Sequence, residues 1–265
     1  MHLSSGDAQI FYQVRGEGPP VVPLHPFPVN HDFWAPAAEL LQARYRLVVP
    51  DLRGHGESSP GEGPATMEKH AADLVRLCDA TGVAKAVFAG VSIGGNILFE
   101  FWRRHRDRVA ALILANTRAA ADTEEGRANR LKSAEEVEKH GPVPFIDSMV
   151  PKLIGQSTRT TRPDLVERAR KMMLSMTVAG IAAVQRGMAA RPDSVPTLKT
   201  INVPTLILAG AEDTLTPVAD AQLMQSHIAD SRLEVLPRAG HYAVFEQHEP
   251  AARLIRNFLD SIKSW

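Results

Sequence analysis

Short hydrophobic segments recur along the chain and alternate with longer segments in which apolar residues have helical spacing. Gly, Pro or charged residues bound the short segments, as is typical of strands buried on both faces of a sheet. They predict strands at residues 10–15, 21–24, 45–50, 85–89, 110–115, 205–209 and 233–236. The longer segments predict helices near residues 32–43, 67–81 and 95–105, and after each of the last two strands. This alternation predicts an α/β fold with a mostly parallel sheet flanked by helices.

One long segment, residues 117–199, interrupts the alternation because its pattern is helical throughout. Breaks fall at Gly141-Pro142, Arg162-Pro163 and Arg191-Pro192, where proline is expected to end or begin a helix. We therefore predict a core made of residues 1–116 and 200–265. The helical segment is expected to fold as an inserted cap over the carboxyl edge of the sheet.

The predicted cap is rich in methionine, with Met172, Met176 and Met188 on its later helices. Ordinary packing against the core explains most such residues. Flexible thioethers also suit an adaptable binding pocket, so these three methionines are candidates for contact with a substrate.

The composition of the chain limits the kinds of partner and the location that we expect for this protein. Lys plus Arg and Asp plus Glu number 30 each, so no net attraction to nucleic acid or to an anionic membrane is expected. No apolar run approaches the length that spans a membrane. The one cysteine, Cys78, lies on an apolar helix face and is interpreted as a small buried hydrophobe. With no disulfide to form and no signal-peptide pattern at the start, a cytoplasmic protein is expected, and a homo-oligomer is left open.

The sequence Gly90-Val91-Ser92-Ile93-Gly94 lies between a predicted strand and a predicted helix. A serine at the apex of such a sharp turn is forced into a strained conformation that exposes its hydroxyl at the sheet edge. The flanking glycines remove Cβ atoms that would clash with the strand and the helix. Ser92 is therefore the candidate nucleophile. The alternative is a serine in an ordinary glycine-rich loop.

A serine nucleophile needs a base, usually histidine, that a carboxylate orients. On this kind of turn the expected chain order is serine, acid, histidine. Asp213 follows the strand at 205–209, with Glu212 as its rival and a helix-capping role as the alternative. His241 follows the last strand, and Gly240 before it allows a close approach of the loop. The other histidines that the pattern places lie in or beside helices, so His241 is the candidate base.

The oxyanion of an acyl-transfer reaction needs two backbone N–H donors. One is expected from Ile93, directly after the nucleophile, and the other from the loop His25-Pro26-Phe27-Pro28. Proline cannot donate, which leaves the Phe27 N–H. The Phe27-Pro28 bond is expected to be cis, and His25 is interpreted as a structural hydrogen-bonding residue.

Together these motifs resemble those of the α/β-hydrolase family, and the resemblance spans nearly the whole chain. It rests on the loop at 25–28, the segment 51–58, the turn around Ser92, the segment 210–217 and Gly240-His241. Pro26 stands where many members carry glycine, which leaves the path of that loop open. Serine at position 92 differs from the aspartate of haloalkane dehalogenases and epoxide hydrolases. The helical cap and residues 116–119 are similar to the branch of 3-oxoadipate enol-lactonases and small carboxylesterases.

The resemblance implies a cofactor-free, metal-free serine hydrolase that cleaves small-molecule esters or lactones through an acyl-enzyme. With Phe27 and Val29 near the entrance, small or medium apolar acyl groups are expected. The same triad would serve C–C bond hydrolysis or perhydrolysis, and these alternatives stay open. A more distant alternative is a ligand-binding receptor of this fold that does not turn over.

Overall fold

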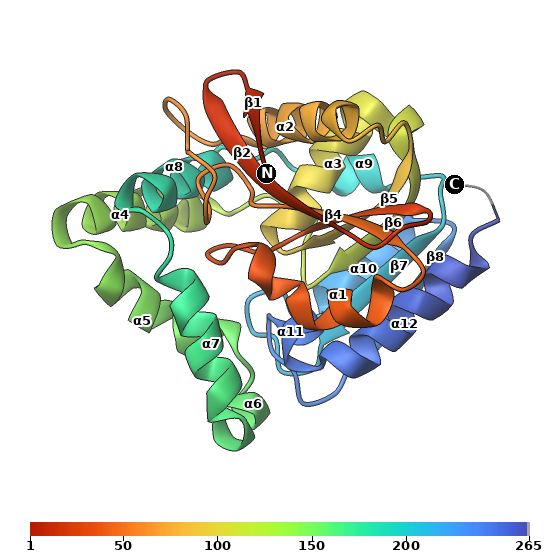
Figure 1. Cartoon of the computed structure of the whole chain (residues 1–265). Helices are drawn as coiled ribbons and strands as arrows, with labels where there is room; N and C mark the ends of the chain where they lie inside the picture. The colour runs from red at the N-terminus through yellow and green to blue at the C-terminus, as the bar shows by residue number, and fades with distance from the viewer. Residues whose placement is uncertain (264–265) are drawn as a thin grey trace.

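The computed structural model describes residues 1–263, and in these residues one sheet of eight strands forms the centre of the molecule (Figure 1). The order across the sheet is β1-β2-β4-β3-β5-β6-β7-β8. β1 pairs with β2, and β2 with β4, in antiparallel register, whereas every later pair is parallel. The strands are β1 His2–Ser5, β2 Ala8–Arg15, β3 Pro20–Leu24, β4 Arg46–Pro50, β5 Ala86–Val91, β6 Val109–Ala115, β7 Thr205–Gly210 and β8 Ser231–Leu236.

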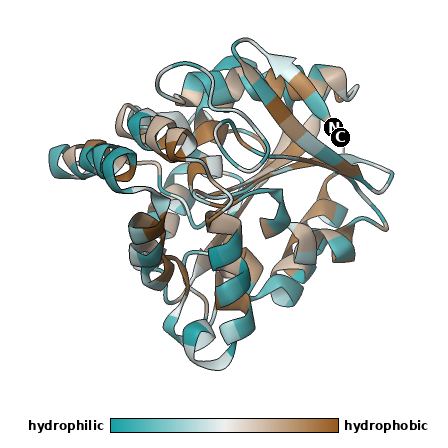
Figure 2. Ribbon diagram, turned by 60° about the vertical axis from the view of Figure 1, so that its left-hand side comes forward, coloured by the Kyte–Doolittle hydropathy of each residue, from teal (hydrophilic) through white to brown (hydrophobic). Residues whose placement is uncertain are grey.

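The middle strands are apolar and covered on both faces. Every residue of β5, β6 and β7 is buried, which explains why these segments are hydrophobic runs without alternation. β8 lies at the edge, and there the side chains are partly exposed. In Figure 2 the strands in the middle of the molecule have mainly the hydrophobic colour, whereas the helices around them carry both colours. The predicted mostly parallel sheet is confirmed.

Helices cover both faces of the sheet. On one face α1 packs against α12, with the short α11 beside them (Figure 1). On the other face α2 packs against α3, which contacts α9, and α9 contacts α10. These helices span Ala35–Leu41 (α1), Met67–Ala80 (α2), Ile93–His105 (α3), Val195–Leu198 (α9), Val218–His227 (α10), Ala243–Glu246 (α11) and His248–Ser261 (α12).

Helices α4 to α8 lie between β6 and β7 in the chain, and we call them the helical insertion. They project to one side of the sheet, at the left of Figure 1, where α4 packs along α8 and α5 contacts α7. Their buried side chains continue the core of the sheet without a gap. They span Glu124–His140 (α4), Pro142–Leu153 (α5), Gln156–Thr161 (α6), Pro163–Met173 (α7) and Val178–Ala189 (α8).

One predicted helix, near residues 32–43, and one predicted strand, at residues 10–15, differ in extent from the structure. The helix expected near 32–43 is divided into a 3-10 turn, η1 (His31–Phe33), and α1, because Pro36 lacks the N–H that a continuous helix would need there. A second 3-10 turn, η2 (Arg106–Arg108), extends the end of α3. The hairpin of β1 and β2 begins earlier than the strand predicted at 10–15. It turns at Gly6, whose φ of 60° favours glycine.

Two further expectations, on membrane-spanning helices and on Cys78, can be compared with the described residues. Among residues 1–263, no helix combines the length and the apolar composition needed to cross a bilayer. Cys78 is buried on α2, and burial raises the pKa of its thiol to about 12. The interpretation of this cysteine as a packed hydrophobe is confirmed.

Candidate active site

Ser92 stands at the apex of a strained turn between β5 and α3. Its φ of 55° and ψ of −114° lie in a region that side-chain-bearing residues rarely adopt. A Cβ on Gly90 would lie 2.5 Å from the backbone carbon of Gly94, and one on Gly94 would lie 2.9 Å from the carbonyl oxygen of Leu24. The strand, the helix and β3 therefore pack so closely that only glycine fits at both flanking positions, as the sequence predicted.

Asp213 lies after β7 and holds a dense set of hydrogen bonds. Its Oδ2 is 2.8 Å from Nδ1 of His241 and accepts from the Thr216 hydroxyl at 2.6 Å, while its Oδ1 accepts from the N–H groups of Leu215 and Thr216. Burial alone would raise the pKa of this carboxyl. The nearby His241 and the hydrogen bonds outweigh burial and hold the pKa of Asp213 below its usual range. The side chain is thus kept as a carboxylate facing the imidazole.

His241 lies in the loop after β8, and its position depends on a close contact with the helical insertion. A Cβ on Gly240 would lie 2.3 Å from the backbone nitrogen of Gly155, so the loop can approach only because residue 240 is glycine. The bond from Nδ1 to Asp213 places the ring proton on Nδ1 and leaves Nε2 as an acceptor.

Ser92 and His241 line one cavity of about 260 Å³. Within residues 1–263 no hydrogen bond joins the Ser92 hydroxyl to the imidazole. Such bonds often tighten only when a substrate is bound. The cavity lies at the carboxyl ends of β5, β6 and β7, beneath the helical insertion. Its lining includes Phe27, Ser92, Asn96, Thr117, Arg118, Arg130, Met149, Leu153, Met188, Arg191, Thr214, Leu215, Thr216 and His241.

The candidate oxyanion donors lie at two places beside this cavity. Ile93 is the first residue of α3, so its N–H has no acceptor within the helix. Phe27 lines the cavity, and its carbonyl accepts from the Tyr242 hydroxyl at 3.1 Å, which ties this loop to the residue after His241. The Phe27-Pro28 peptide bond is cis, as predicted.

His25 anchors the same loop from below. It is fully buried, its Nδ1 lies 2.9 Å from the Pro26 carbonyl oxygen, and its Nε2 accepts from the Leu52 N–H at 2.9 Å. Burial lowers the pKa of His25 to about 4, so the ring is neutral near pH 7. This agrees with a structural role for His25.

The candidate substrate-contacting residues divide into two groups. Met188 and Phe27 line the cavity with Ser92. Val29, Met172 and Met176 are buried and are not among the described residues that line it. These three side chains pack in the core, the alternative that the sequence left open for the methionines.

Asn116 is a site residue that the sequence analysis did not single out. It follows β6 with φ of 43°, and its Nδ2 donates to Oδ2 of Asp213 at 2.8 Å and to the carbonyl of Gly240 at 3.2 Å. One amide thus holds the acid and the histidine loop together. The signal available in the sequence was its position directly after a central strand. That strand lies next to the two strands that precede Ser92 and Asp213.

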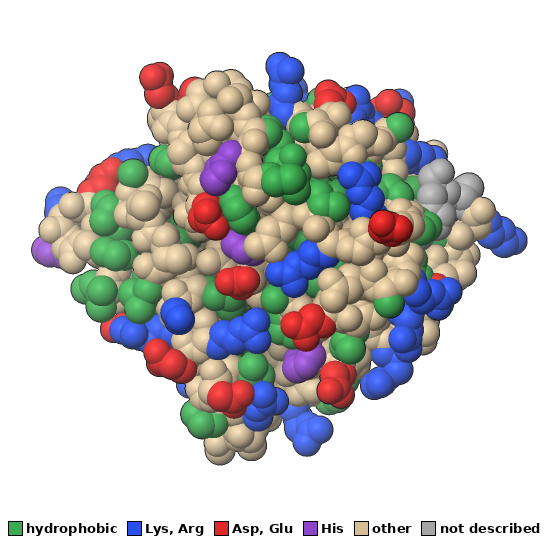
Figure 3. Space-filling model, viewed as in Figure 1, with side chains coloured by type: hydrophobic (Ala, Val, Ile, Leu, Met, Phe, Trp, Pro, Cys, Tyr) green, Lys and Arg blue, Asp and Glu red, His purple; other side chains and the backbone are tan. Residues whose placement is uncertain are grey.

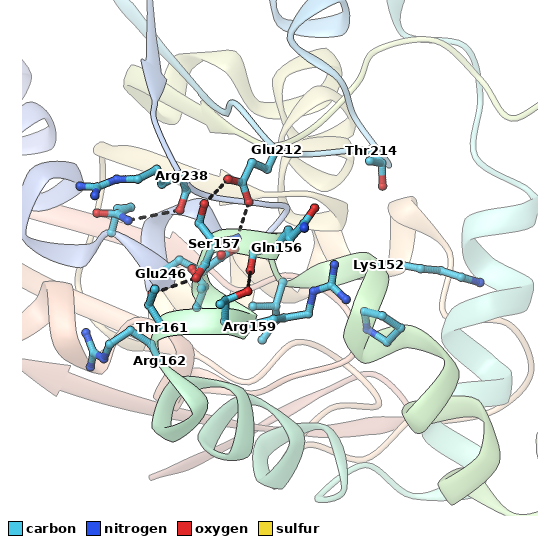
Figure 4. Close-up of a pocket in the computed structure, with 15 residues that line it drawn as sticks. Lys152, Gln156, Ser157, Arg159, Thr161, Arg162, Glu212, Thr214, Arg238 and Glu246 are labelled. Carbon is cyan, nitrogen blue, oxygen red and sulfur yellow. Dashed lines mark hydrogen bonds between the residues drawn. The ribbon is translucent and has the colours of Figure 1, made fainter.

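Among the described residues, Glu212, the rival acid, has its hydrogen bonds with Ser157 of the helical insertion and none with His241. Figure 4 shows its carboxylate reaching Ser157, which donates its backbone N–H at 2.9 Å and its hydroxyl. The buried Glu246 on α11 makes a second link, accepting from the N–H groups of Gly155 and Gly240 at 3.0 Å each. These two carboxylates attach the start of α6 to the loops that carry Asp213 and His241. The surface hollow here, of about 690 Å³, does not include Ser92 or His241 in its lining.

Charge on the outside of the molecule is mixed. Figure 3 shows acidic and basic side chains interspersed over one face, in keeping with the equal numbers of the two kinds in the chain. The electrostatic environment of the site therefore depends on the residues that line it and not on a net charge of this surface.

The chain belongs to the α/β-hydrolase family. The model of that family, described as alpha/beta hydrolase fold, matches residues 19–247. The chain is 29% identical over 253 residues to 3-oxoadipate enol-lactonase 1 of Acinetobacter baylyi, covering 95% of this chain and 93% of that protein.

Solved structures of similar proteins agree in fold. A thermophilic esterase from Thermogutta terrifontis, solved with malate bound, is 39% identical with a TM-score of 0.95, and the match covers 99% of this chain and 97% of that one. The enol-lactonase from Burkholderia xenovorans LB400 is 25% identical with a TM-score of 0.92, covering 98% and 100% of the two chains.

Proposed function

We propose that this chain hydrolyses small carboxylic esters or lactones through an acyl-enzyme on Ser92. The broader assignment, an ester or lactone hydrolase, follows from the family and from the esterase and enol-lactonase relatives. The finer assignment of the reaction to named residues is supported most by one observation. Asp213 is hydrogen-bonded to His241, and His241 shares a small cavity with the strained Ser92.

The proposed chemistry follows from the tautomer of His241. Its Nε2 is the free acceptor, so it takes the proton of the Ser92 hydroxyl as the oxygen attacks the substrate carbonyl. The N–H groups of Ile93 and Phe27 bind the oxygen on which negative charge develops. His241 then returns the proton to the leaving alcohol oxygen. A water activated in the same way releases the acyl group as a carboxylic acid.

The helical insertion would act as the cap of this site. Met149, Leu153 and Met188 bring its side chains into the lining, and the volume of about 260 Å³ suits a short acyl chain. A cytoplasmic location stays part of the proposal, on the basis of the buried single cysteine.

The experiment is ester turnover by wild type and Ser92→Ala. With p-nitrophenyl butyrate, wild type should release p-nitrophenolate continuously, and the variant should lose about 10³-fold or more in kcat. Ser226→Ala, which removes an exposed hydroxyl on α10, is the matched control and should keep full activity. Unchanged turnover in Ser92→Ala would contradict the proposal. A single stoichiometric burst without further turnover in wild type would favour a ligand-binding protein instead.

A further inference from the structure

The side chain of Tyr242, the residue directly after His241, carries a buried hydroxyl with one defined acceptor. The ring is fully buried and packs edge-on against the ring of Phe33, with the two centroids 5.3 Å apart. Among the described residues, the hydroxyl makes one hydrogen bond, which it donates to the carbonyl oxygen of Phe27 at 3.1 Å. A phenylalanine would fill the same space without a polar group to desolvate. The hydrogen bond to Phe27 is therefore what a tyrosine adds at this position.

The backbone of Tyr242 is held on both sides, so its hydroxyl has a fixed place. Its N–H donates to the carbonyl oxygen of Leu153 in the helical insertion at 3.0 Å. Its own carbonyl accepts from the N–H groups of Phe245 and Glu246 at 2.8 Å each. Burial holds the pKa of the phenol well above its usual range. The hydroxyl thus keeps its proton and stays a hydrogen-bond donor.

The residue that accepts this bond, Phe27, has a backbone N–H without an acceptor. Phe27 is 5% exposed and lines the cavity that contains Ser92. Among the described residues, its N–H donates to no oxygen. A buried N–H without an acceptor is rare in folded proteins. This group is therefore available to the oxygen of a substrate, as the candidate oxyanion donor must be.

Two buried side chains hold the peptide groups on either side of Phe27. Because a peptide group is planar, the direction of the Phe27 N–H is fixed by the carbonyl of Pro26, which shares its plane. His25 holds that carbonyl: its Nε2 accepts from the Leu52 N–H, which leaves Nδ1 to donate to the Pro26 oxygen at 2.9 Å. Tyr242 holds the next carbonyl along the chain, that of Phe27 itself. With both carbonyls held, neither peptide group can turn without breaking a buried hydrogen bond.

Tyr242 therefore connects the candidate base with the candidate oxyanion donor. One peptide bond joins it to His241, and one hydrogen bond joins it to Phe27. The ring of Phe27 has further contacts, with the rings of Phe145 and His55 at 5.9 and 5.7 Å between centroids. Those contacts hold the side chain of Phe27 but bring no polar group to its carbonyl. Among the described residues, the Tyr242 hydroxyl is the group that does so.

We propose that Tyr242 is a positioning residue, whose hydroxyl holds the Phe27 N–H at the point where negative charge forms on the substrate oxygen. The inference rests on the proposed hydrolytic function, because it assigns this N–H to the oxyanion of that reaction. A slightly displaced donor still admits the substrate, whose carbonyl carries little charge, but it stabilises the transition state less. Loss of the hydroxyl is therefore expected to lower kcat and to leave KM nearly unchanged.

The test is Tyr242→Phe, which removes one oxygen atom and keeps the ring. With p-nitrophenyl butyrate, kcat should fall about tenfold, less than the roughly 10²- to 10³-fold that loss of a whole oxyanion donor costs, and KM should stay within about twofold. Tyr12→Phe is the matched control, because Tyr12 is also buried but lies on β2, outside the lining of the cavity. It should keep the kinetics of wild type. Equal kinetics in the two variants would overturn the inference and leave the proposed function standing.

A transition-state analogue separates positioning from a general loss of stability. In butyl trifluoromethyl ketone, the Ser92 oxygen adds to the carbonyl carbon, His241 takes the serine proton, and the negative oxygen of the adduct lies at the N–H donors. The inhibition constant should rise in Tyr242→Phe by about the factor by which kcat falls, and should not change in Tyr12→Phe. A lower kcat with an unchanged inhibition constant would show that the hydroxyl does not act on the oxyanion donor.

His241, the other neighbour of Tyr242, is monitored separately. The proton on its Nδ1, which faces Asp213, should give the same NMR signal in wild type and in Tyr242→Phe, because that bond does not involve the hydroxyl. Disappearance of this signal in Tyr242→Phe would mean that Tyr242 acts through His241, contrary to the inference.

Ser92→Ala distinguishes failure of this inference from failure of the proposed function. Ester turnover that survives Ser92→Ala would remove the proposed function, and the role of Tyr242 with it. Turnover that depends on Ser92 but not on the Tyr242 hydroxyl would remove the role of Tyr242 alone. Turnover that depends on both, with weaker binding of the ketone in Tyr242→Phe, is the result that we expect.

Discussion

Two adjacent carboxylates after β7 have different hydrogen-bond partners, although they are neighbours in the chain. Asp213 is 6% exposed and bonded to His241, Thr216 and Asn116, whereas Glu212 is half-buried and bonded to Ser157. The sequence left both as candidate acids, because neighbouring residues in a loop share every signal of position. Only the direction of each side chain, set by its partners, distinguishes them.

Exchange of each carboxylate for its amide tests this assignment. In Asp213→Asn the amide can no longer hold His241 in the required tautomer, and kcat should fall by about 10³- to 10⁴-fold. Glu212→Gln should keep kcat within about threefold of wild type, since any loss acts only through the attachment of α6. Steady-state turnover of p-nitrophenyl butyrate measures both. The reverse order of losses would make Glu212 the acid.

Asp213 also gives a pH dependence of stability with a defined sign. Its pKa is lower in the folded state than in the unfolded chain, so the carboxylate stabilises the fold at pH values above the unfolded pKa of about 3.9. This contribution is lost as pH falls below that value. Denaturant titrations at about pH 7 and about pH 3 should therefore show a smaller acid-induced loss in Asp213→Asn than in wild type. An equal or larger loss would contradict the lowered pKa.

At the scale of elements, the short helix α11 links the helical insertion to the histidine loop. Its last residue, Glu246, is 5% exposed and accepts two backbone N–H bonds, from Gly155 and Gly240. Burial raises the pKa of Glu246, and these hydrogen bonds partly offset the effect. The carboxylate thus satisfies two buried donors at once, on both sides of the contact between insertion and core.

Replacing Glu246 by Gln should weaken this contact. The amide has one acceptor oxygen and places an NH₂ against the second N–H, so about 1.5–3 kcal/mol of stability should be lost, as for hydrogen bonds to charged groups. Thermal unfolding should shift down by several degrees, and kcat should fall because Gly240 precedes His241. Glu249→Gln, on the exposed start of α12, is the control. An unchanged melting temperature would show that the link contributes nothing.

Element positions were largely predictable because the central strands are continuous apolar runs. β5 and β6 were predicted to within a few residues, since burial on both faces requires such composition. The first hairpin was predicted only in part, because β1 is mostly exposed and has little hydrophobic signal. The turn at Trp34 depends on Pro36 within a pattern that otherwise continues as a helix.

At the scale of the whole molecule, the sequence could predict the candidate catalytic residues but not which other side chains line the cavity beside them. Ser92, Asp213 and His241 were predicted from their positions after strands, since parallel strands bring such loops to one edge. Arg118, Arg130 and Arg191, which line the same cavity, carried no comparable signal, because nothing local shows that three segments between β6 and β7 meet at the carboxylate of Asp122. For the same reason the methionines could not be assigned to the cavity or the core. The division of the chain at 116/117 and 199/200 stays a prediction.

The central claim is that distant segments meet so that one serine, Ser92, is made nucleophilic. Reaction with a fluorophosphonate, followed by peptide mass spectrometry, tests it most directly, because only a serine with a working base and oxyanion donors reacts rapidly. The account predicts one phosphonyl group per chain, on Ser92, and greatly slowed labelling in His241→Ala. Labelling of another residue, or labelling at Ser92 that is unaffected by the loss of His241, would contradict it.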